Sequence, residues 1–223
     1  MLKERNIPYN KYFLIPFLGW VIIGGLLQMI FTQEQLFAAI NTHFNDPLNF
    51  ILYYTTWMGT GQVITLCLLL LMFLKPFRNL WYFAAASVCN LIPFFTQQWL
   101  KSYFDCPRPL YYFHEARWIH ILPDWPVLMH RSFPSGHSEG AFCFFCFLSL
   151  LLPEKYYKVG AVLFVLALAV CYSRLYLAAH FFEDVYAGSI MGAVMSMLLF
   201  AVMKKYKSRL MWPKNKQALT GNA

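Results

Sequence analysis

Four ionisable side chains lie close together in the stretch SRLYLAAHFFED, between two long apolar runs. They are Arg174, His180, Glu183 and Asp184. Ionisable groups at the edge of a membrane segment are costly, so such a cluster indicates a functional site. Asp184 lies four residues after His180 and Glu183 three, so on a helix either carboxylate can hydrogen-bond the imidazole. The spacing does not choose between them, but either bond would leave the second ring nitrogen free to attack.

A second set of polar residues lies in the long loop that precedes this stretch. Lys101 and Arg108 stand near its start, and it ends in the sequence FPSGH. Ser135 is a favourable N-cap for a following helix, and Gly136 allows close approach of the backbone to a ligand. The free N–H groups of such a helix start bind anions, and His137 would lie in this first turn.

Brought together, these residues have the composition of a phosphate site. Arginine binds phosphate through two parallel hydrogen bonds and lysine adds a point charge, so Lys101, Arg108 and Arg174 can neutralise a phosphoryl group. The same cations can stabilise the additional charge of an in-line transition state without a metal ion. One of the two histidines can attack phosphorus while the other protonates the leaving oxygen.

Three motifs in this order resemble those of the type 2 phosphatidic acid phosphatase (PAP2) family, in its integral-membrane branch. A single motif of this kind is weak evidence, but three complete motifs in order are strong evidence. The motifs are Lys101-x6-Arg108-Pro109, Pro134-Ser135-Gly136-His137 and Ser173-Arg174-x5-His180-x3-Asp184.

The resemblance implies a role for each motif residue. His180 is the nucleophile that forms a phosphohistidine, Asp184 orients it, and His137 is the general acid for the leaving group. The resemblance implies neither a metal ion nor a cofactor. The residues implied to hold the phosphate are Lys101, Arg108, Ser135, Gly136 and Arg174.

Two acidic residues are left without a role by this resemblance. Glu139 follows the PSGH motif, where an acidic residue is unusual, and either tunes His137 or faces the headgroup region. Glu183 remains a second candidate partner for His180 by spacing alone.

Two simpler readings of the ionisable cluster are possible. Arg174 and Asp184 would form a structural ion pair if the cluster stood alone, with His180 a satisfied polar group between helices. A metal site at His180, Glu183 and Asp184 would need more acidic partners and would lie poorly beside three cations. The two further motifs favour the phosphate site over both.

The composition of the chain is that of a membrane protein. Of its 223 residues, 59% are hydrophobic and 13% are charged, with a mean hydropathy of +0.47. Soluble domains are about half apolar and a quarter charged. We therefore expect one domain over residues 1–223, an all-α polytopic bundle of six transmembrane helices, with a PAP2/haloperoxidase-like core by resemblance. A short interfacial helix is expected within 32–50. The expected spans are 12–31, 51–74, 79–100, 135–152, 157–178 and 183–203.

The distribution of basic residues predicts the orientation in the membrane. Most of the 18 lysines and arginines lie in the N-terminal segment, the turns at 74–79 and 153–158, and the basic tail 204–223. Six spans place all of these on one side, which the positive-inside rule makes cytoplasmic, together with both termini. The chain has a net charge of +8, which could indicate binding to nucleic acid. The regular alternation of the basic segments between the two sides of the membrane argues against that interpretation. The motifs at 101–184 then face the periplasm or the exterior.

The predicted function is a metal-independent phosphatase for a membrane lipid phosphate or diphosphate, in a bacterial inner membrane. Candidate substrates are undecaprenyl diphosphate, phosphatidylglycerol phosphate, phosphatidic acid and lipid A. A phosphotransferase could use the same site, with an alcohol or lipid accepting the phosphoryl group. A vanadate-dependent haloperoxidase shares such an anion site but is typically soluble, and a non-catalytic transporter or scaffold would tolerate loss of His180. The oligomeric state is left open.

Overall fold

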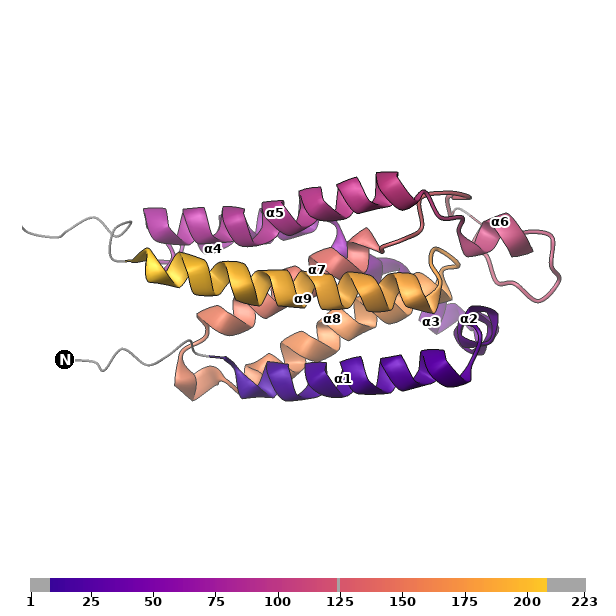
Figure 1. Ribbon diagram of the computed structural model, residues 1–223, viewed down its shortest axis with the longest axis horizontal. Helices are drawn as coiled ribbons and strands as arrows, with labels where there is room; N and C mark the ends of the chain where they lie inside the picture. The colour runs from indigo at the N-terminus through magenta and orange to yellow at the C-terminus, as the bar shows by residue number, and fades with distance from the viewer. Residues whose placement is uncertain (1–8, 124, 208–223) are drawn as a thin grey trace, which may run out of the picture.

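The computed structural model describes residues 9–123 and 125–207, and all regular structure in this part of the chain is helical. Figure 1 shows the long helices running side by side along one axis, with the short helices Gln33–Asn41, Asp46–Thr55 and Pro109–Phe113 together at one end. The helices are α1 (Lys11–Ile30), α2 (Gln33–Asn41), α3 (Asp46–Thr55), η1 (Thr56–Gly59), α4 (Gly61–Leu71), α5 (Leu80–Phe104), α6 (Pro109–Phe113), α7 (Gly136–Leu151), η2 (Glu154–Tyr156), α8 (Val159–Tyr176) and α9 (Phe182–Lys205).

Helix α7 forms the centre of the bundle. It packs against α4, α5, α8 and α9, and most of its side chains are buried, among them Ala141, Phe142, Cys143 and Phe147. A helix of this length extends about 24 Å, which is less than the ~30 Å hydrocarbon core of a bilayer. The expected fourth span is therefore a short helix covered by protein, and its apolar composition reflects contact with other helices.

Length and hydropathy identify fewer candidate transmembrane helices in the described residues than the six expected from the sequence. Within the described residues, α1, α8 and α9 are each long and apolar enough to span a bilayer. The segment Asp46–Gly59 and helix α4 pass the same test only as a pair, bent by 64°. These features make the chain a membrane protein, while the count of six remains a prediction.

The expected span at 51–74 and the expected interfacial helix at 32–50 have different boundaries in the structure. Helix α2 begins after Thr32, whose hydroxyl accepts the N–H of Gln35 in a capping box. A separate helix, α3, begins after Asn45 and runs into the apolar segment. Thr60 then caps α4, since its hydroxyl accepts a hydrogen bond from Val63 N–H. Three polar caps thus divide a region that hydropathy treats as two segments.

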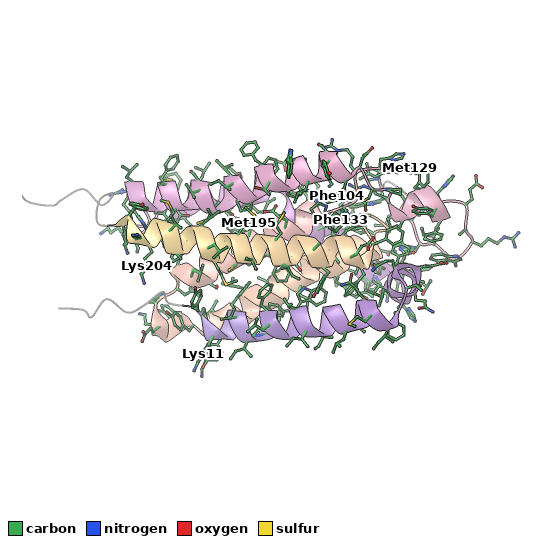
Figure 2. The ribbon with its side chains drawn as sticks, viewed as in Figure 1. Lys11, Phe104, Met129, Phe133, Met195 and Lys204 are labelled. Atoms are coloured by element: carbon green, nitrogen blue, oxygen red, sulfur yellow. The ribbon has the colours of Figure 1, made fainter. Side chains whose placement is uncertain are left out.

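Basic residues and the polar loops lie at opposite ends of the bundle. Figure 2 shows Lys11 and Lys204 at one end, and Phe104, Met129 and Phe133 at the other. A hydrogen bond joins two helices at the end that holds these lysines. Trp81 Nε1, in the first turn of α5, donates to the carbonyl of Met203 in the last turn of α9. The motif-bearing loops therefore meet at the end away from these lysines.

The contact between α7 and α9 is close because glycine faces the neighbouring backbone. A Cβ on Gly188 would lie 2.5 Å from the carbonyl oxygen of Ser135, and one on Gly192 would collide with the carbonyl oxygen of Glu139. Glycine leaves room for backbone to touch backbone, as in many membrane helix pairs. This contact places the first turn of α7 directly on α9.

We expect Gly188→Ala to destabilise the protein by about 1–3 kcal/mol, because the added methyl group overpacks the α7–α9 contact. The readout is the melting temperature in detergent. Gly19→Ala is the matched control, since a Cβ at Gly19 meets nothing within 4 Å and alanine favours the helix. Equal melting temperatures for the two variants would contradict the close contact.

Candidate active site

His180 and Asp184 lie at the junction of α8 and α9, where the chain reverses direction. Helix α8 ends at Tyr176, and Ala178 adopts the left-handed conformation with φ 51°. Helix α9 then begins at Phe182, so His180 lies in the turn between the two helices and Asp184 in the first turn of α9. The ring nitrogen Nδ1 of His180 is 3.4 Å from Asp184 Oδ2, and both side chains are almost fully buried.

Asp184 is itself held in place by two further donors to the same oxygen. The backbone N–H of Phe181 donates to Oδ2 at 2.8 Å, and the hydroxyl of Ser132 donates to it at 2.5 Å. The Ser132 hydroxyl also lies 3.3 Å from His180 Nδ1. The carboxylate thus has a single orientation, with one oxygen facing the imidazole.

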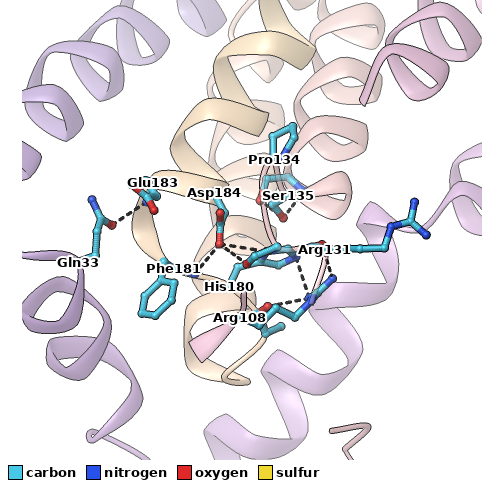
Figure 3. Close-up of polar contacts among 12 residues, drawn as sticks. Gln33, Arg108, Arg131, Pro134, Ser135, His180, Phe181, Glu183 and Asp184 are labelled. Atoms are coloured by element: carbon cyan, nitrogen blue, oxygen red, sulfur yellow. Dashed lines mark hydrogen bonds and ion pairs between the residues drawn. The ribbon is translucent and has the colours of Figure 1, made fainter. Parts of the chain in front are cut away.

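Glu183 has a different position from the one its spacing allowed. Glu183 is exposed, and its backbone N–H donates to the side-chain oxygen of Gln33 at 3.0 Å. Figure 3 shows Glu183 on the side toward Gln33, whereas Asp184 faces His180. Of the two carboxylates that spacing permits, Asp184 is the one beside the imidazole.

Arg108 approaches His180 from the opposite side of the ring. Its Nη1 is 3.3 Å from His180 Nε2 and donates to the carbonyl of Ala179 at 2.7 Å. Its Nε and Nη2 donate to the carbonyls of His130 and Arg131 at 2.8 and 3.1 Å (Figure 3). These three carbonyl groups hold the buried guanidinium against the imidazole. Burial lowers the pKa of Arg108 to about 10, so Arg108 stays charged at neutral pH.

The surroundings of His180 favour a neutral imidazole. Burial lowers its pKa well below the ordinary 6.5, and the charges of Arg108, Arg174 and Lys101 lower it further. With Nδ1 directed at Asp184 and Nε2 directed at a guanidinium, the consistent tautomer carries its proton on Nδ1. The lone pair of Nε2 then points toward the cations.

The PSGH turn is joined to the same site through its backbone. The N–H of Ser135 donates to the carbonyl of Asp184 at 3.0 Å, and its hydroxyl accepts from the N–H and hydroxyl of Ser138. Gln97 of α5 donates from Nε2 to the carbonyl of Pro134 at 2.9 Å. Ser135 is therefore the N-cap of α7, as expected, and its backbone is bonded to the residue that orients His180.

Lys101, Gly136 and His137 line a cavity of about 830 Å³ between α4 and α5. Lys101 lies in the last turn of α5, and both Gly136 and His137 lie in the first turn of α7. The cavity is where the lysine of the first motif and the histidine of the second meet. His180 is buried and lies outside the lining of this cavity.

Arg174 reaches the site from α8 and is also buried. Its Nη1 donates to the hydroxyl of Thr56 at 2.7 Å, and its guanidinium stacks over Trp125 with 5.4 Å to the ring centroid. Its charge acts on both His180 and Arg108. The ion pair of Arg174 with Asp184 that the simpler reading proposed is replaced by these contacts.

Four residues that contact the motif residues were not expected from the sequence. Ser132 and Gln97 hold the His180–Asp184 pair and the PSGH turn, while Thr56 and Trp125 hold Arg174. Only Ser132 had a signal in the sequence, a hydroxyl two positions before Pro134. Gln97 lies one helical turn before Lys101 but has no pattern that predicts its contact, and packing brings Thr56 and Trp125 to Arg174.

Metal ligands are sparse around these residues. Among residues 9–123 and 125–207, no group of three or more His, Cys, Asp or Glu side chains has an arrangement that could hold a metal ion. Besides Asp184, the charged groups that act on His180 include the cations Arg108, Arg174 and Lys101.

The sequence matches the model of a known protein family. The sequence model of the PAP2 superfamily matches residues 79–208, more than half of the chain and all three motifs. The chain belongs to the PAP2 superfamily. This confirms the family resemblance that the motifs carried.

Individual PAP2 relatives agree with this membership. A stretch of 104 residues is 34% identical to phosphatidylglycerophosphatase B of Bacillus subtilis (strain 168), covering 42% of this chain and 49% of that protein. The match thus spans about half the length of the curated relative. The PAP2 family and the name of this relative indicate a phosphatase.

Two solved structures share the fold. The crystal structure of Aquifex aeolicus LpxE has a TM-score of 0.61 at 24% identity, over 74% of this chain and 93% of that one. The first transmembrane PAP2 type phosphatidylglycerolphosphate phosphatase from Bacillus subtilis has a TM-score of 0.56 at 21% identity, over 92% and 100%. These likenesses show that the helical bundle is a PAP2 fold.

Ser132→Ala tests the contact that holds Asp184. We expect kcat to fall about 5–30-fold with little change in KM, because the carboxylate loses a hydrogen bond and aims the imidazole less well. The measurement is phosphate release from a lipid phosphate in detergent. Ser102→Ala, an exposed serine on α5, is the control and should keep wild-type kcat. A change confined to KM would argue against a positioning role for Ser132.

Proposed function

We propose that this chain is a metal-independent phosphatase that removes phosphate from a membrane lipid through a phosphohistidine intermediate. The observation that carries the proposal is the environment of His180. Its imidazole lies between the carboxylate of Asp184 and the guanidinium of Arg108, and it is close enough to Lys101 and His137, which line the cavity, for their charges to act on it. A neutral nucleophile, an orienting carboxylate and a cationic pocket are the groups that phosphoryl transfer requires.

In the proposed reaction, His180 Nε2 attacks phosphorus in line with the lipid oxygen. The N–P bond forms as the P–O bond to the lipid breaks, and His137 donates a proton to the departing alkoxide. A water molecule then attacks the phosphohistidine after giving its proton to His137, which releases inorganic phosphate and restores both histidines. Asp184 stabilises the positive charge that develops on the ring during each step.

The same proposal assigns the anion-binding groups. Arg108 and Arg174 hold the phosphoryl oxygens, Lys101 adds charge from the cavity wall, and Ser135 and Gly136 contribute the start of α7. Because the cations already neutralise the phosphate, no divalent ion is needed for the transition state.

The proposed orientation follows from the two ends of the bundle. The site lies at the end away from Lys11 and Lys204 (Figure 2), so the positive-inside rule places these lysines in the cytoplasm and the site outside. Lys3, Arg5 and the basic residues of the tail beyond Lys207 lie outside the described residues. Six spans with both ends cytoplasmic, in a bacterial inner membrane, complete this topology.

The name of the Bacillus subtilis relative makes phosphatidylglycerol phosphate the first substrate to test. Phosphatidic acid, undecaprenyl diphosphate and lipid A are the comparison substrates. We expect His180→Ala to abolish phosphate release from the preferred lipid, because the nucleophile is lost. Glu183→Gln is the matched control, since its side chain faces away from the imidazole, and should keep activity within twofold.

One outcome would contradict the assignment of His180, and another would change the acceptor of the phosphoryl group. Full phosphate release by the His180→Ala protein would exclude it as the nucleophile. Transfer of labelled phosphate to an added alcohol or lipid, with little free phosphate, would instead identify a phosphotransferase.

Removal of divalent metal gives an independent test. We expect EDTA to leave kcat unchanged, and orthovanadate to inhibit by occupying the phosphoryl site in a five-coordinate geometry. The measurement is initial rate against chelator or vanadate concentration. Loss of activity in EDTA that is restored by added metal would contradict the role given to the three cations.

A further inference from the structure

The cavity beside the active site is longer than a phosphate group requires. It begins at Lys101 and His137 and continues between α4 and α5 as far as Met72 and Tyr82. Nineteen residues of α5 separate Tyr82 from Lys101, which corresponds to about 28 Å of helix. A lipid chain fits such a length, and its headgroup would lie at the end that holds Lys101.

The cavity opens sideways and is closed at its inner end. The Tyr82 hydroxyl donates to the carbonyl of Leu68 at 3.0 Å, joining α5 to α4 there. The lining side chains Leu69, Phe83 and Leu91 are about half exposed on the apolar surface of the bundle, the first two next to this contact and Leu91 nearer the site. A lipid can therefore enter between α4 and α5 from within the bilayer.

Two buried acceptors in this cavity have no partner in the described part of the chain. Glu139 Oε1 and Gln97 Oε1 are both unpaired, and the two residues are only 2% and 1% exposed. Both residues line the cavity alongside Gly136 and His137. The other end of the Gln97 amide is fixed, because Nε2 donates to the carbonyl of Pro134.

The two acceptors are close to the reacting groups along the chain. Glu139 lies in the first turn of α7, two residues after His137. Gln97 lies one helical turn before Lys101 on α5, and its amide is next to the Cα of Gly136. A ligand atom that reaches both would belong to the lipid segment directly attached to the phosphate.

Unpaired buried acceptors cost free energy unless a ligand supplies donors. A phosphorylated glycerol has a hydroxyl group on the carbon next to the phosphorylated one, and this hydroxyl can donate to either oxygen. An isoprenoid phosphate has only hydrocarbon at that position and would leave both oxygens unpaired. The lining therefore favours the first class of lipid.

Resting on the proposed phosphatase function, we propose that Glu139 and Gln97 bind a hydroxyl group adjacent to the phosphorylated carbon of the substrate. The preferred substrate is then a glycerol-type lipid phosphate with that hydroxyl free. Glu139 and Gln97 determine specificity, while the histidines and cations carry out the reaction. The unusual acidic residue after the PSGH motif thereby gains a function.

A matched pair of lipids tests the proposal. The probes are 1-oleoyl lysophosphatidic acid, which has the free hydroxyl, and its 2-deoxy analogue, which differs only by loss of that group. We expect the wild-type protein to prefer the first by about tenfold in kcat/KM, the effect of one buried hydrogen bond. A ratio near one would overturn the proposal.

Substitutions at Glu139 test whether this residue binds the hydroxyl group of the substrate. Glu139→Leu should bring the ratio of the two kcat/KM values close to one, and Glu139→Gln, which keeps the shape and an acceptor, should keep most of the preference. Ser196→Ala is the control, because it removes another unpaired buried oxygen that lies outside the cavity. An unchanged ratio in Glu139→Leu would exclude the role of this carboxyl.

A binding measurement separates this proposal from the phosphatase function. The His180→Ala protein should still bind lysophosphatidic acid more tightly than the deoxy analogue, and the added Glu139→Leu change should remove the difference. If neither lipid is hydrolysed by wild type but this preference is seen, the phosphatase function fails and the hydroxyl site stands. If both are hydrolysed and bound equally, the hydroxyl site fails and the phosphatase function stands.

Thermal stability provides a second readout for Glu139. Glu139→Leu should melt at a higher temperature than wild type, because a buried polar group without a partner is replaced by an apolar one. A lower melting temperature together with equal loss of activity toward both lipids would show a structural role and overturn the proposal.

Discussion

The backbone contact between the first turn of α7 and the first turns of α9 is the constraint on which the site depends. Gly188 and Gly192 let α9 approach the carbonyls of Ser135 and Glu139, so the PSGH turn lies directly against the helix that carries Asp184. The hydrogen bond from Ser135 N–H to the Asp184 carbonyl forms across this contact. Ser135 and Asp184, which are 49 residues apart in the chain, therefore share one rigid unit.

Burial of cations is the second organising feature, and it explains the number of contacts to the arginines. A buried charge is unfavourable unless hydrogen bonds compensate it. Arg108 is held by three carbonyl groups, and Arg174 by a threonine hydroxyl and a tryptophan ring. These contacts use neutral partners, so the positive charge of both guanidinium groups remains available to an anionic ligand. Carboxylate partners would have cancelled it.

The motif residues could be identified from the sequence because each motif is local and chemically distinctive. The choice between Glu183 and Asp184 required the structure, since both spacings fit one face of a helix and only the turn after Ala178 decides which carboxyl faces His180. The contact of Thr56 with Arg174 was missed because tertiary packing alone brings the two residues together, and that of Ser132 because its place beside the second motif does not show that it faces Asp184.

Helix boundaries show the limit of hydropathy. An apolar side chain has the same hydropathy whether it faces lipid or protein. Hydropathy therefore could not show that most of α7 is covered by other helices. The bend at Thr60 was missed because one polar cap hardly changes the mean hydropathy of a long apolar segment.

The hydrogen bond from Tyr82 to Leu68 joins α4 and α5 near one end of the cavity, and the lining residues Leu69, Phe83 and Leu91 are exposed on the apolar surface of the bundle. A ligand that reaches the site by this route diffuses in two dimensions and never leaves the membrane. Its encounter rate then depends on its mole fraction among the surrounding lipids. Diluting the membranes in buffer would leave turnover unchanged, whereas diluting the ligand with inert lipid would slow it.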